Sequence, residues 1–315
     1  MVRKALLAGA ACLIGWSGVV FAADYPAKPI ELVVPSKAGG STDATARIFA
    51  EIAESKFDGF KFVINNIGGS GGQKGFEAIA RAEPDGYTIG MVFTPQLVAH
   101  IAAGRTQYTL ESFHVIGNTA EDAGIVAVPK DSPIATLADL AGASAESPAT
   151  VAVNGIGSDD FLAAKAFEEA AGVSFNLLPT KGSTEQKAGI LGGHVDASFM
   201  NLSQMIAQHQ AGDARIIAVL TEERSALLPD VPTAKEQGFE VLMRATRGFV
   251  APADVDAEIL AKLDGMLAEV MADPAFIEKA GASSIYLMPM NGPDYLSYLQ
   301  DLQADTQKVY DAAPW

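Results

Sequence analysis

Short apolar runs alternate along the chain with longer segments in which apolar residues recur every three or four positions. The first run, Ile30–Val34, is β-branched and ends at Pro35, and a helical segment from about residue 43 to 55 follows a glycine-containing turn. The same order recurs after Phe62–Ile67 and after Tyr87–Phe93. Strand patterns that alternate with helical patterns in this way predict an α/β fold.

A second block repeats the pattern between residues 124 and 220. Its predicted strands, with helices between them, are Gly124–Val128, Thr150–Val153, Phe175–Pro179, Val195–Met200 and Arg215–Leu220. Past Arg244 the chain is mostly helical, over about 256–271, 274–280 and 293–310, and we expect these helices to pack back onto the first block. The chain would then cross near Ala123 and near Arg244 between two α/β lobes. Lobe 1 takes residues 23–123 plus 245–315, and lobe 2 takes residues 124–244.

Residues 1–22 have the pattern of an export signal. Two basic residues precede an apolar stretch, and the small residues Val20 and Ala22 favour cleavage after Ala22. No later stretch is long and apolar enough to span a bilayer, so we expect a periplasmic protein that is secreted through the inner membrane. The single cysteine, Cys12, leaves with the signal. A lipidated Cys12 is the alternative, although the usual leucine before such a cysteine is missing.

The charge of the chain narrows the possible partners. It has 38 acidic and 22 basic residues, a net charge of −16, and removal of the signal takes away two basic residues. Such an excess of negative charge argues against nucleic acid and anionic membrane surfaces as partners. An acidic protein that binds an anion must therefore do so with local dipoles and a few placed cations.

Small-residue loops stand repeatedly between a predicted strand and a predicted helix. Free N–H groups and the positive end of the helix dipole favour anions at such helix starts, and small residues let a ligand approach the backbone. The alternative is that Ser41, Ser158 and Ser183 only cap their helices. The loops are 36–43, 68–72 and Thr94 in one lobe, and 154–159, 180–184 and 201–203 in the other.

Ser70 lies within Gly68–Gly72, which matches the G-x-S-x-G pattern of a hydrolase nucleophile. A hydrolase also needs a histidine and an acid, and none of the four histidines falls in a predicted strand-end loop. We expect no metal site, because no histidine pair has the i, i+4 spacing and no cysteine survives export. Gly155 and Gly157 lack the third glycine of a dinucleotide-binding loop, so we expect no cofactor.

Several short segments, taken in their order and spacing, resemble the TctC, or Bug, family of extracytoplasmic receptors. Each segment alone is weak evidence, but together they run from Tyr25 to near the C-terminus. The segments are Tyr25–Pro35, Ala38–Asp43, Pro84–Thr88, Lys181–Ser183, Gly192–Asp196 and Pro229–Thr233.

The resemblance implies a periplasmic-binding-protein type II-like fold, in which two α/β lobes surround a cleft as in a Venus flytrap. It implies a receptor, not an enzyme, that captures a small carboxylate such as a di- or tricarboxylate or an aromatic acid. The partners would be the membrane carrier subunits of a tripartite tricarboxylate transporter, and we expect a monomer. Two alternatives stay open at this point: a receptor that presents its ligand to a sensor kinase, and an exported serine hydrolase that uses Ser70.

One departure from the family concerns the late crossover, where many members have an aromatic residue before the glycine and this chain has Arg247. Its guanidinium suits bidentate carboxylate binding, and an ion pair between the lobes is the alternative role. Helix-start loops and the resemblance together predict a ligand site made of Ala38, Gly39, Gly40, Ser41, Thr42, Asp43, Thr94, Gly157, Ser158, Asp159, Thr180, Lys181, Ser183, Asn201 and Arg247.

Overall fold

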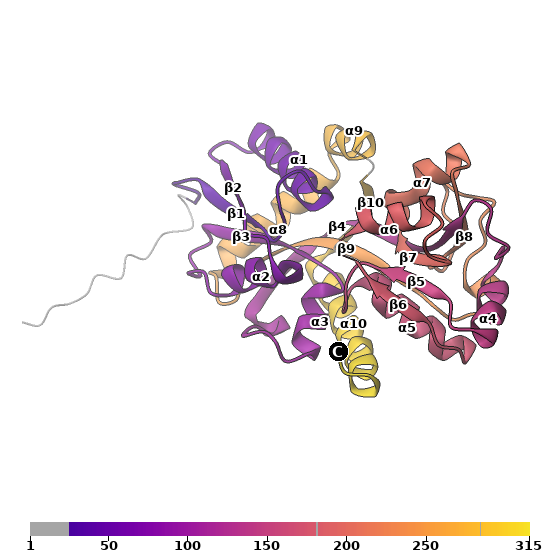
Figure 1. Ribbon diagram of the computed structural model, residues 1–315. Coiled ribbons are helices and arrows are strands. Elements are labelled where there is room, and N and C mark those ends of the chain that lie inside the picture. Colours follow the sequence, from indigo (N-terminus) through magenta and orange to yellow (C-terminus); the bar gives the residue numbers. More distant parts are fainter. Residues whose placement is uncertain (1–24, 181, 284) are drawn as a thin grey trace, which may run out of the picture.

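The computed structural model describes residues 25–180, 182–283 and 285–315. The predicted signal of residues 1–22 and the predicted site residue Lys181 lie outside these ranges. Within them, no helix has both the length and the apolar character needed to cross a bilayer. Figure 1 shows two α/β bodies, the first and second lobes, joined across the middle by two long strands.

The first lobe is built on parallel strands at the N-terminal end of the chain. Strand β1 pairs with β2 on one side and with β3 on the other. Residues such as Ile30 and Leu32 are fully buried, as expected for β-branched and apolar runs covered by helices on both faces. The elements are β1 (Ile30–Val34), α1 (Ser41–Lys56), β2 (Phe62–Asn66), α2 (Gln73–Ala80), β3 (Thr88–Phe93) and α3 (Gln96–Ala102).

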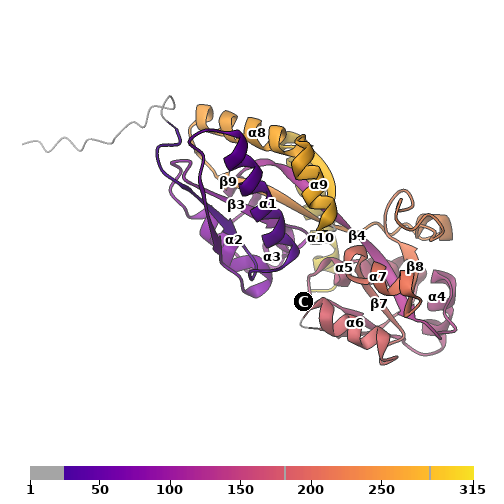
Figure 2. The same ribbon diagram turned by 90° about the horizontal axis from the view of Figure 1, so that it is seen from above.

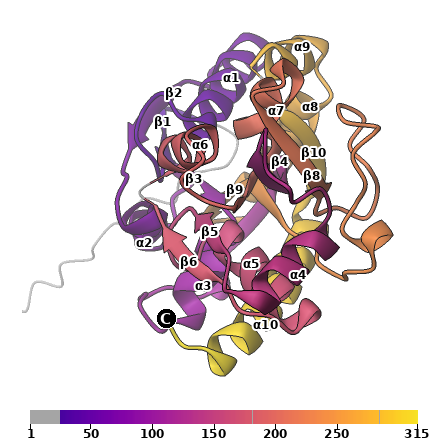
Figure 3. The ribbon, with the colours of Figure 1, turned by 45° about the vertical axis from the view of Figure 1, so that its right-hand side comes forward.

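The second lobe repeats this plan with its own hydrophobic core. Helices α4 and α5 pack on one face of its sheet, around Phe167, and α6 and α7 pack on the other, around Met205 (Figure 3). The elements are α4 (Leu137–Glu146), β5 (Thr150–Val153), α5 (Asp159–Ala171), β6 (Asn176–Pro179), α6 (Ser183–Leu191), β7 (Ala197–Asn201), α7 (Leu202–Ala211) and β8 (Ala214–Val219).

The two lobes share an antiparallel ribbon of β4 (Phe113–Pro129) and β9 (Arg244–Pro252). The pairing runs from Phe113 opposite Pro252 to Ala123 opposite Arg244. Strand β4 then continues into the second lobe, where it pairs with β7 and β8. The predicted strand over 124–128 is thus only the last part of a 17-residue strand. Its first half was not predicted, because polar residues such as Asn118 and Asp122 interrupt the apolar pattern and yet are buried.

The tail returns to the first lobe, as expected, but it is not only helical. Strand β10 (Tyr286–Asn291) pairs with β4, and β9 lies between β3 and β4. The helices of the tail are α8 (Ala257–Met271), α9 (Pro274–Ala282) and α10 (Gly292–Ala312). Helix α10 also reaches the second lobe, since Val309 and Trp315 pack against the core around α5.

Three predicted helix starts differ from the structure in their capping. The N-caps of α1 and α6 are glycines, Gly40 and Gly182, and neither makes a side-chain cap hydrogen bond. Ser41 and Ser183 are therefore first-turn residues and not caps. Ser158 does cap α5, because its Oγ accepts from the Phe161 N–H at 3.1 Å. From residue type we also expect Ser203 to cap the helix that runs to Gln210, but α7 begins at Leu202 with Asn201 as its cap.

Gly248 provides a test of the packing that holds β9 in the first lobe. A Cβ atom there would lie 2.2 Å from the Tyr295 ring and 2.8 Å from the Gly117 carbonyl oxygen. We expect Gly248→Ala to lower the free energy of unfolding by about 1–3 kcal/mol in urea titrations, because a packed backbone cannot move aside freely. The control is Gly265→Ala in α8, where nothing lies within 4 Å. Alanine should stabilise this helix by up to ~1 kcal/mol. Equal unfolding midpoints for the two variants would contradict the packing described.

Candidate ligand-binding cleft

A cavity of about 700 Å³ lies between the two lobes. Figure 2 shows the two lobes from above, with α1 and α3 in the first lobe and α5 and α6 in the second. The lining of the cavity comes from helix-start loops of both lobes, from α3 and from the segment after α10. The residues are Pro35, Ser36, Lys37, Gly68 to Gln73, Phe93, Gln96, Ala99, His100, Arg105, Asn154 to Ser158, Thr180 and Trp315.

The charge of this cleft is opposite to that of the protein. None of the described residues that line it is Asp or Glu, although the chain has 38 acidic residues, and Lys37 and Arg105 are both present. The N-terminus of α5 also opens at its wall through Gly157 and Ser158. The positive end of a 13-residue helix adds to the field of these side chains. The cleft is therefore an anion-attracting site on an acidic protein.

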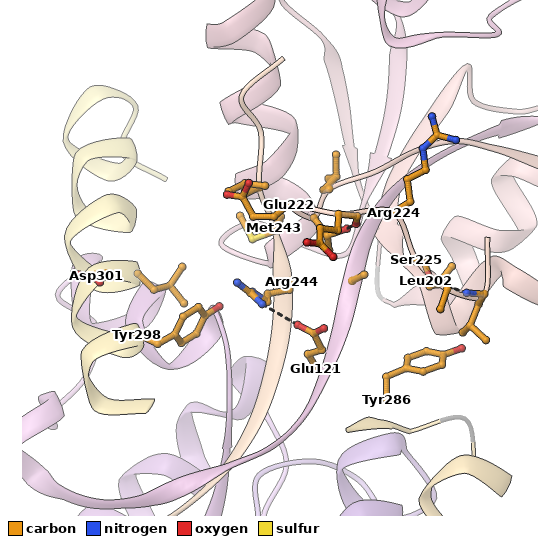
Figure 4. Close-up of a pocket in the computed structure, with 18 of the residues that line it drawn as sticks. Glu121, Leu202, Glu222, Arg224, Ser225, Met243, Arg244, Tyr286, Tyr298 and Asp301 are labelled. Carbon is orange, nitrogen blue, oxygen red and sulfur yellow. Dashed lines mark hydrogen bonds and ion pairs between the residues drawn. The ribbon is translucent and has the colours of Figure 1, made fainter. Parts of the chain in front are cut away.

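A second cavity, of about 620 Å³, lies beside the ribbon and has a mostly acidic lining (Figure 4). Its two arginines are already paired: Arg244 lies 3.1 Å from Glu121, beneath the Tyr298 ring face at 5.6 Å, and Arg224 lies 2.8 Å from Glu236. Its acidic lining residues are Glu121, Glu222, Glu223, Asp301 and Asp305. An anion would meet repulsion here, so the cleft between the lobes is the better candidate for an anionic ligand.

The predicted loop at the start of α1 is held by Asp43. This buried carboxylate accepts hydrogen bonds from the Gly39 N–H, the Arg47 Nε and the Asn66 amide, each at 2.9 Å. These bonds hold the pKa of Asp43 below its usual value even though burial acts in the other direction. Asp43 thus shapes the loop from within, and the exposed residues from Ala38 to Ser41 form its surface beside the cleft.

Arg247 is an ion-pair partner within the ribbon. Its guanidinium lies 3.6 Å from the Asp122 carboxylate, and both side chains are nearly buried. Asp122 also accepts from the Ser203 N–H at 3.0 Å and from the Ser203 hydroxyl, which ties the ribbon to the start of α7. Asn201 donates to Asp159 at 2.6 Å and thereby joins α5 to the same network.

Three buried aspartates meet at this point with one arginine. Burial, together with the nearby Asp122 and against the Asn201 hydrogen bond, raises the pKa of Asp159 to about 6. Burial and the adjacent Asp159 raise the pKa of Asp160 well above its usual range, although Gln186 and the Asn154 N–H donate to it. Burial also raises the pKa of Asp122. The network holds more carboxyl groups than one guanidinium can balance, and the raised pKa values favour their protonated forms.

The structure divides the predicted site residues among three places. Gly157, Ser158 and Thr180 line the cleft. Thr94, Asp159 and Asn201 are buried at the ribbon and the adjacent helix starts, beside the nearly buried Arg247, and Thr94 there bonds the Thr246 hydroxyl at 2.7 Å. The remaining described residues stand at two helix starts, Ala38 to Asp43 at α1 and Ser183 at α6.

Several lining residues were not predicted. Lys37 stands inside a predicted loop but was passed over for its small neighbours. His100, Arg105 and Trp315 come from α3 and from the segments after α3 and α10, so only the tertiary fold brings them to the cleft. No hydrogen bond joins His100 to the Ser70 hydroxyl in the described part of the chain; His100 Nε2 lies 3.3 Å from the Gly71 carbonyl oxygen instead. The arrangement lacks the nucleophile–base contact of a serine hydrolase.

Two glycines of the site differ in backbone conformation. Gly157 has φ +80°, which favours glycine, and a Cβ there would lie 3.2 Å from the Trp315 indole nitrogen. Gly40 has φ −84°, which any residue can adopt, and its nearest neighbour, the Lys37 carbonyl oxygen, would be 3.7 Å from a Cβ. A side chain at position 40 therefore costs the fold little, whereas one at position 157 strains the backbone as well as narrowing the cleft.

A comparison with protein families bears directly on this two-lobed arrangement. Residues 45–313 match the family of receptors of tripartite tricarboxylate transporters, called TctC. The chain belongs to the TctC family. TctC proteins are solute-binding receptors and not enzymes, which agrees with the hydrogen bonding around Ser70 and confirms the family predicted from the sequence motifs.

Relatives and solved TctC structures agree over most of their length. Protein BugT of Bordetella pertussis is 31% identical, covering 88% of this chain and 87% of its own. A TctC solute-binding protein from Polaromonas, solved without ligand, has a TM-score of 0.81 and 26% identity, covering 91% of this chain and 99% of its own. R. palustris Rpa4515, solved with adipate, has a TM-score of 0.78 and 26% identity, covering 91% and 98%. These neighbours confirm the two-lobed α/β fold.

The raised pKa of Asp159 predicts a pH-dependent stability. Between about pH 4 and 6 the folded protein binds this proton more tightly than the unfolded chain does. The Asp159 carboxyl therefore lowers the free energy of unfolding increasingly as the pH rises through this window. We expect Asp159→Asn to exceed the wild type in free energy of unfolding at pH 7.5 by roughly 1–3 kcal/mol, and by much less at pH 4.5.

Urea unfolding at both pH values measures this difference. The matched control is Asp131→Asn, a change at an exposed aspartate that should move stability by less than ~0.5 kcal/mol at either pH. A stability difference for Asp159→Asn that does not change between the two pH values would contradict the assignment.

Proposed function

We propose that this protein captures a small carboxylate in the cleft between its lobes and delivers it to the membrane carrier of a tripartite tricarboxylate transporter. The observation that carries the proposal is the cleft itself: its described lining is free of Asp and Glu, contains Lys37 and Arg105, and includes the N-terminus of α5. Adipate in the related Rpa4515 shows that a carboxylate suits this fold. The ligand class includes di- and tricarboxylates and aromatic acids.

The proposal includes a hinge. The lobes would comprise residues 23–123 plus 245–315 and residues 124–244, and they would close by bending of the ribbon near Ala123 and Arg244, which are paired neighbours in β4 and β9. The Arg247–Asp122 pair lies a few residues inside these points. Exposed helix starts at α1 and α6 would then approach the ligand from opposite sides.

The proposed setting is the periplasm, which fits the receptor family. The signal of residues 1–22 would be cleaved after Ala22, and the mature protein would act as a monomer. The acidic surface suits a freely diffusing carrier protein, because it repels anionic membrane surfaces.

A thermal-shift screen tests the function. Aliphatic dicarboxylates, tricarboxylates and aromatic acids are compared with neutral sugars and cationic amines. A ligand at 100 times its dissociation constant adds about 2.7 kcal/mol of stability, which raises the melting temperature by several degrees. We expect carboxylates alone to give such shifts. Stabilisation by sugars or amines, and not by carboxylates, would refute the proposal.

Lys37 provides a mutational prediction for the same site. Its exposed side chain lines the cleft. Lys37→Ala should raise the dissociation constant for the best carboxylate about tenfold, a loss of ~1.4 kcal/mol of binding free energy. The control is Lys130→Ala, which makes the same change in net charge at an exposed position outside the cleft lining. Isothermal titration calorimetry on both variants should show less than a twofold change for Lys130→Ala. Equal losses in both would mean that net charge, not Lys37, is responsible.

A further inference from the structure

Trp315 is part of the cleft wall. It follows α10, and the Arg105 guanidinium donates to its main-chain oxygen, which connects the segment to the end of α3. Its indole packs edge-on against Phe161 of α5, with ring centroids 5.5 Å apart, and against Tyr310 at 4.9 Å. The indole nitrogen also lies beside Gly157 in the cleft lining. Residues of both lobes thus hold the indole beside the N-terminus of α5.

Trp315 is joined by two further apolar side chains that reach the cleft. Ile156 projects from the loop before α5 and is 54% exposed, which is unusual for an isoleucine beside a polar helix start. Phe93 lies across the cleft at the end of β3 and is half-buried. We call Trp315, Ile156 and Phe93 the apolar wall. A ligand that covers this wall removes it from water, at about 25 cal/mol per Å² of apolar surface.

The cations of the cleft are fewer than its composition suggests. Arg105 already donates to the main chain of Trp315. Burial, partly offset by the Gly71 carbonyl, lowers the pKa of His100 below its usual value and so disfavours the charged imidazolium. Among the described lining residues, Lys37 is then the cation whose ammonium makes no hydrogen bond or ion pair within the protein, so it is the first to meet a carboxylate. One ammonium and one helix N-terminus match a single carboxylate better than two.

We propose that the preferred ligand is an aromatic monocarboxylate, with its ring on the apolar wall and its carboxylate between Lys37 and the N-terminus of α5. The inference rests on the proposed function and narrows its ligand class. Trp315 is the residue that selects a flat apolar body, because its indole lines the cleft directly beside Gly157 at the start of α5. An aliphatic dicarboxylate would bring a second charge to this apolar wall, and Arg105, the other basic side chain of the described lining, is already held by Trp315.

Titration of the mature protein with benzoate, cyclohexanecarboxylate, adipate and succinate tests the inference. Trp315 is the single tryptophan of the mature chain once Trp16 has left with the signal, so its fluorescence reports directly on the wall. We expect benzoate to change the emission and to bind at least tenfold more tightly than adipate in calorimetry. Cyclohexanecarboxylate, of similar size but not flat, should fall between them.

Variants at position 315 separate ligand selection from folding. Trp315→Ala should weaken benzoate binding at least tenfold and adipate binding less than threefold. Trp315→Phe should restore most of the benzoate affinity. Dissociation constants are measured well below the melting temperature of each variant, so that a loss of stability is not mistaken for a loss of binding.

The other outcomes are distinct. Tighter binding of adipate or succinate than of benzoate would overturn the inference and leave the carboxylate receptor intact. Equal losses of benzoate and adipate affinity in Trp315→Ala would overturn the selecting role of Trp315. Failure of every carboxylate to bind would overturn the proposed function itself.

Discussion

The antiparallel pairing of β4 with β9 is the constraint on which the rest of the molecule depends. This ribbon carries the chain between the lobes, completes the sheet of the first lobe and continues through β4 into the second. Its buried polar groups are tied to helix starts on the second lobe, as in the bonds from Ser203 to Asp122. Anything that moves one lobe must bend this ribbon or break those bonds. The cleft therefore has a defined width set by hydrogen bonds and not by loose linkers.

The acidic residues are distributed away from the cleft. A strongly acidic chain keeps Asp and Glu out of the described lining of its cleft and gathers them elsewhere, on the surface and around the cavity in Figure 4. The three aspartates of the ribbon network are buried close to the cleft but are engaged by amides, hydroxyls and Arg247. Their pKa values are raised because burial disfavours the charged form, and this lowers the negative potential that an incoming anion meets.

The local patterns of the sequence were sufficient for the α/β class, for most helices and strands and for the helix-start loops. They were insufficient where tertiary contacts override the pattern. The first half of β4 carries buried polar residues whose partners are far away in sequence, such as Asn118, which donates to the Met288 carbonyl. Trp315 has no local feature that connects it to Gly157, because α10 alone brings it there. Residue type suggested Ser203 as the cap of α7 and, as an alternative to ligand binding, Ser41 as the cap of α1, but Asn201 and Gly40 hold these positions in the structure.

The position of β9 between β3 and β4 has a consequence for the order of folding. A chain that is made N-terminus first presents β1, β2 and β3 long before β9, which pairs with β3 over residues 247–250. The second lobe, by contrast, closes its sheet from nearly contiguous segments, β4 to β8. Contacts that are close in sequence form faster than distant ones. The second lobe is thus expected to fold first. The sheet of the first lobe keeps an unpaired edge at β3 until β9 is available to pair with it.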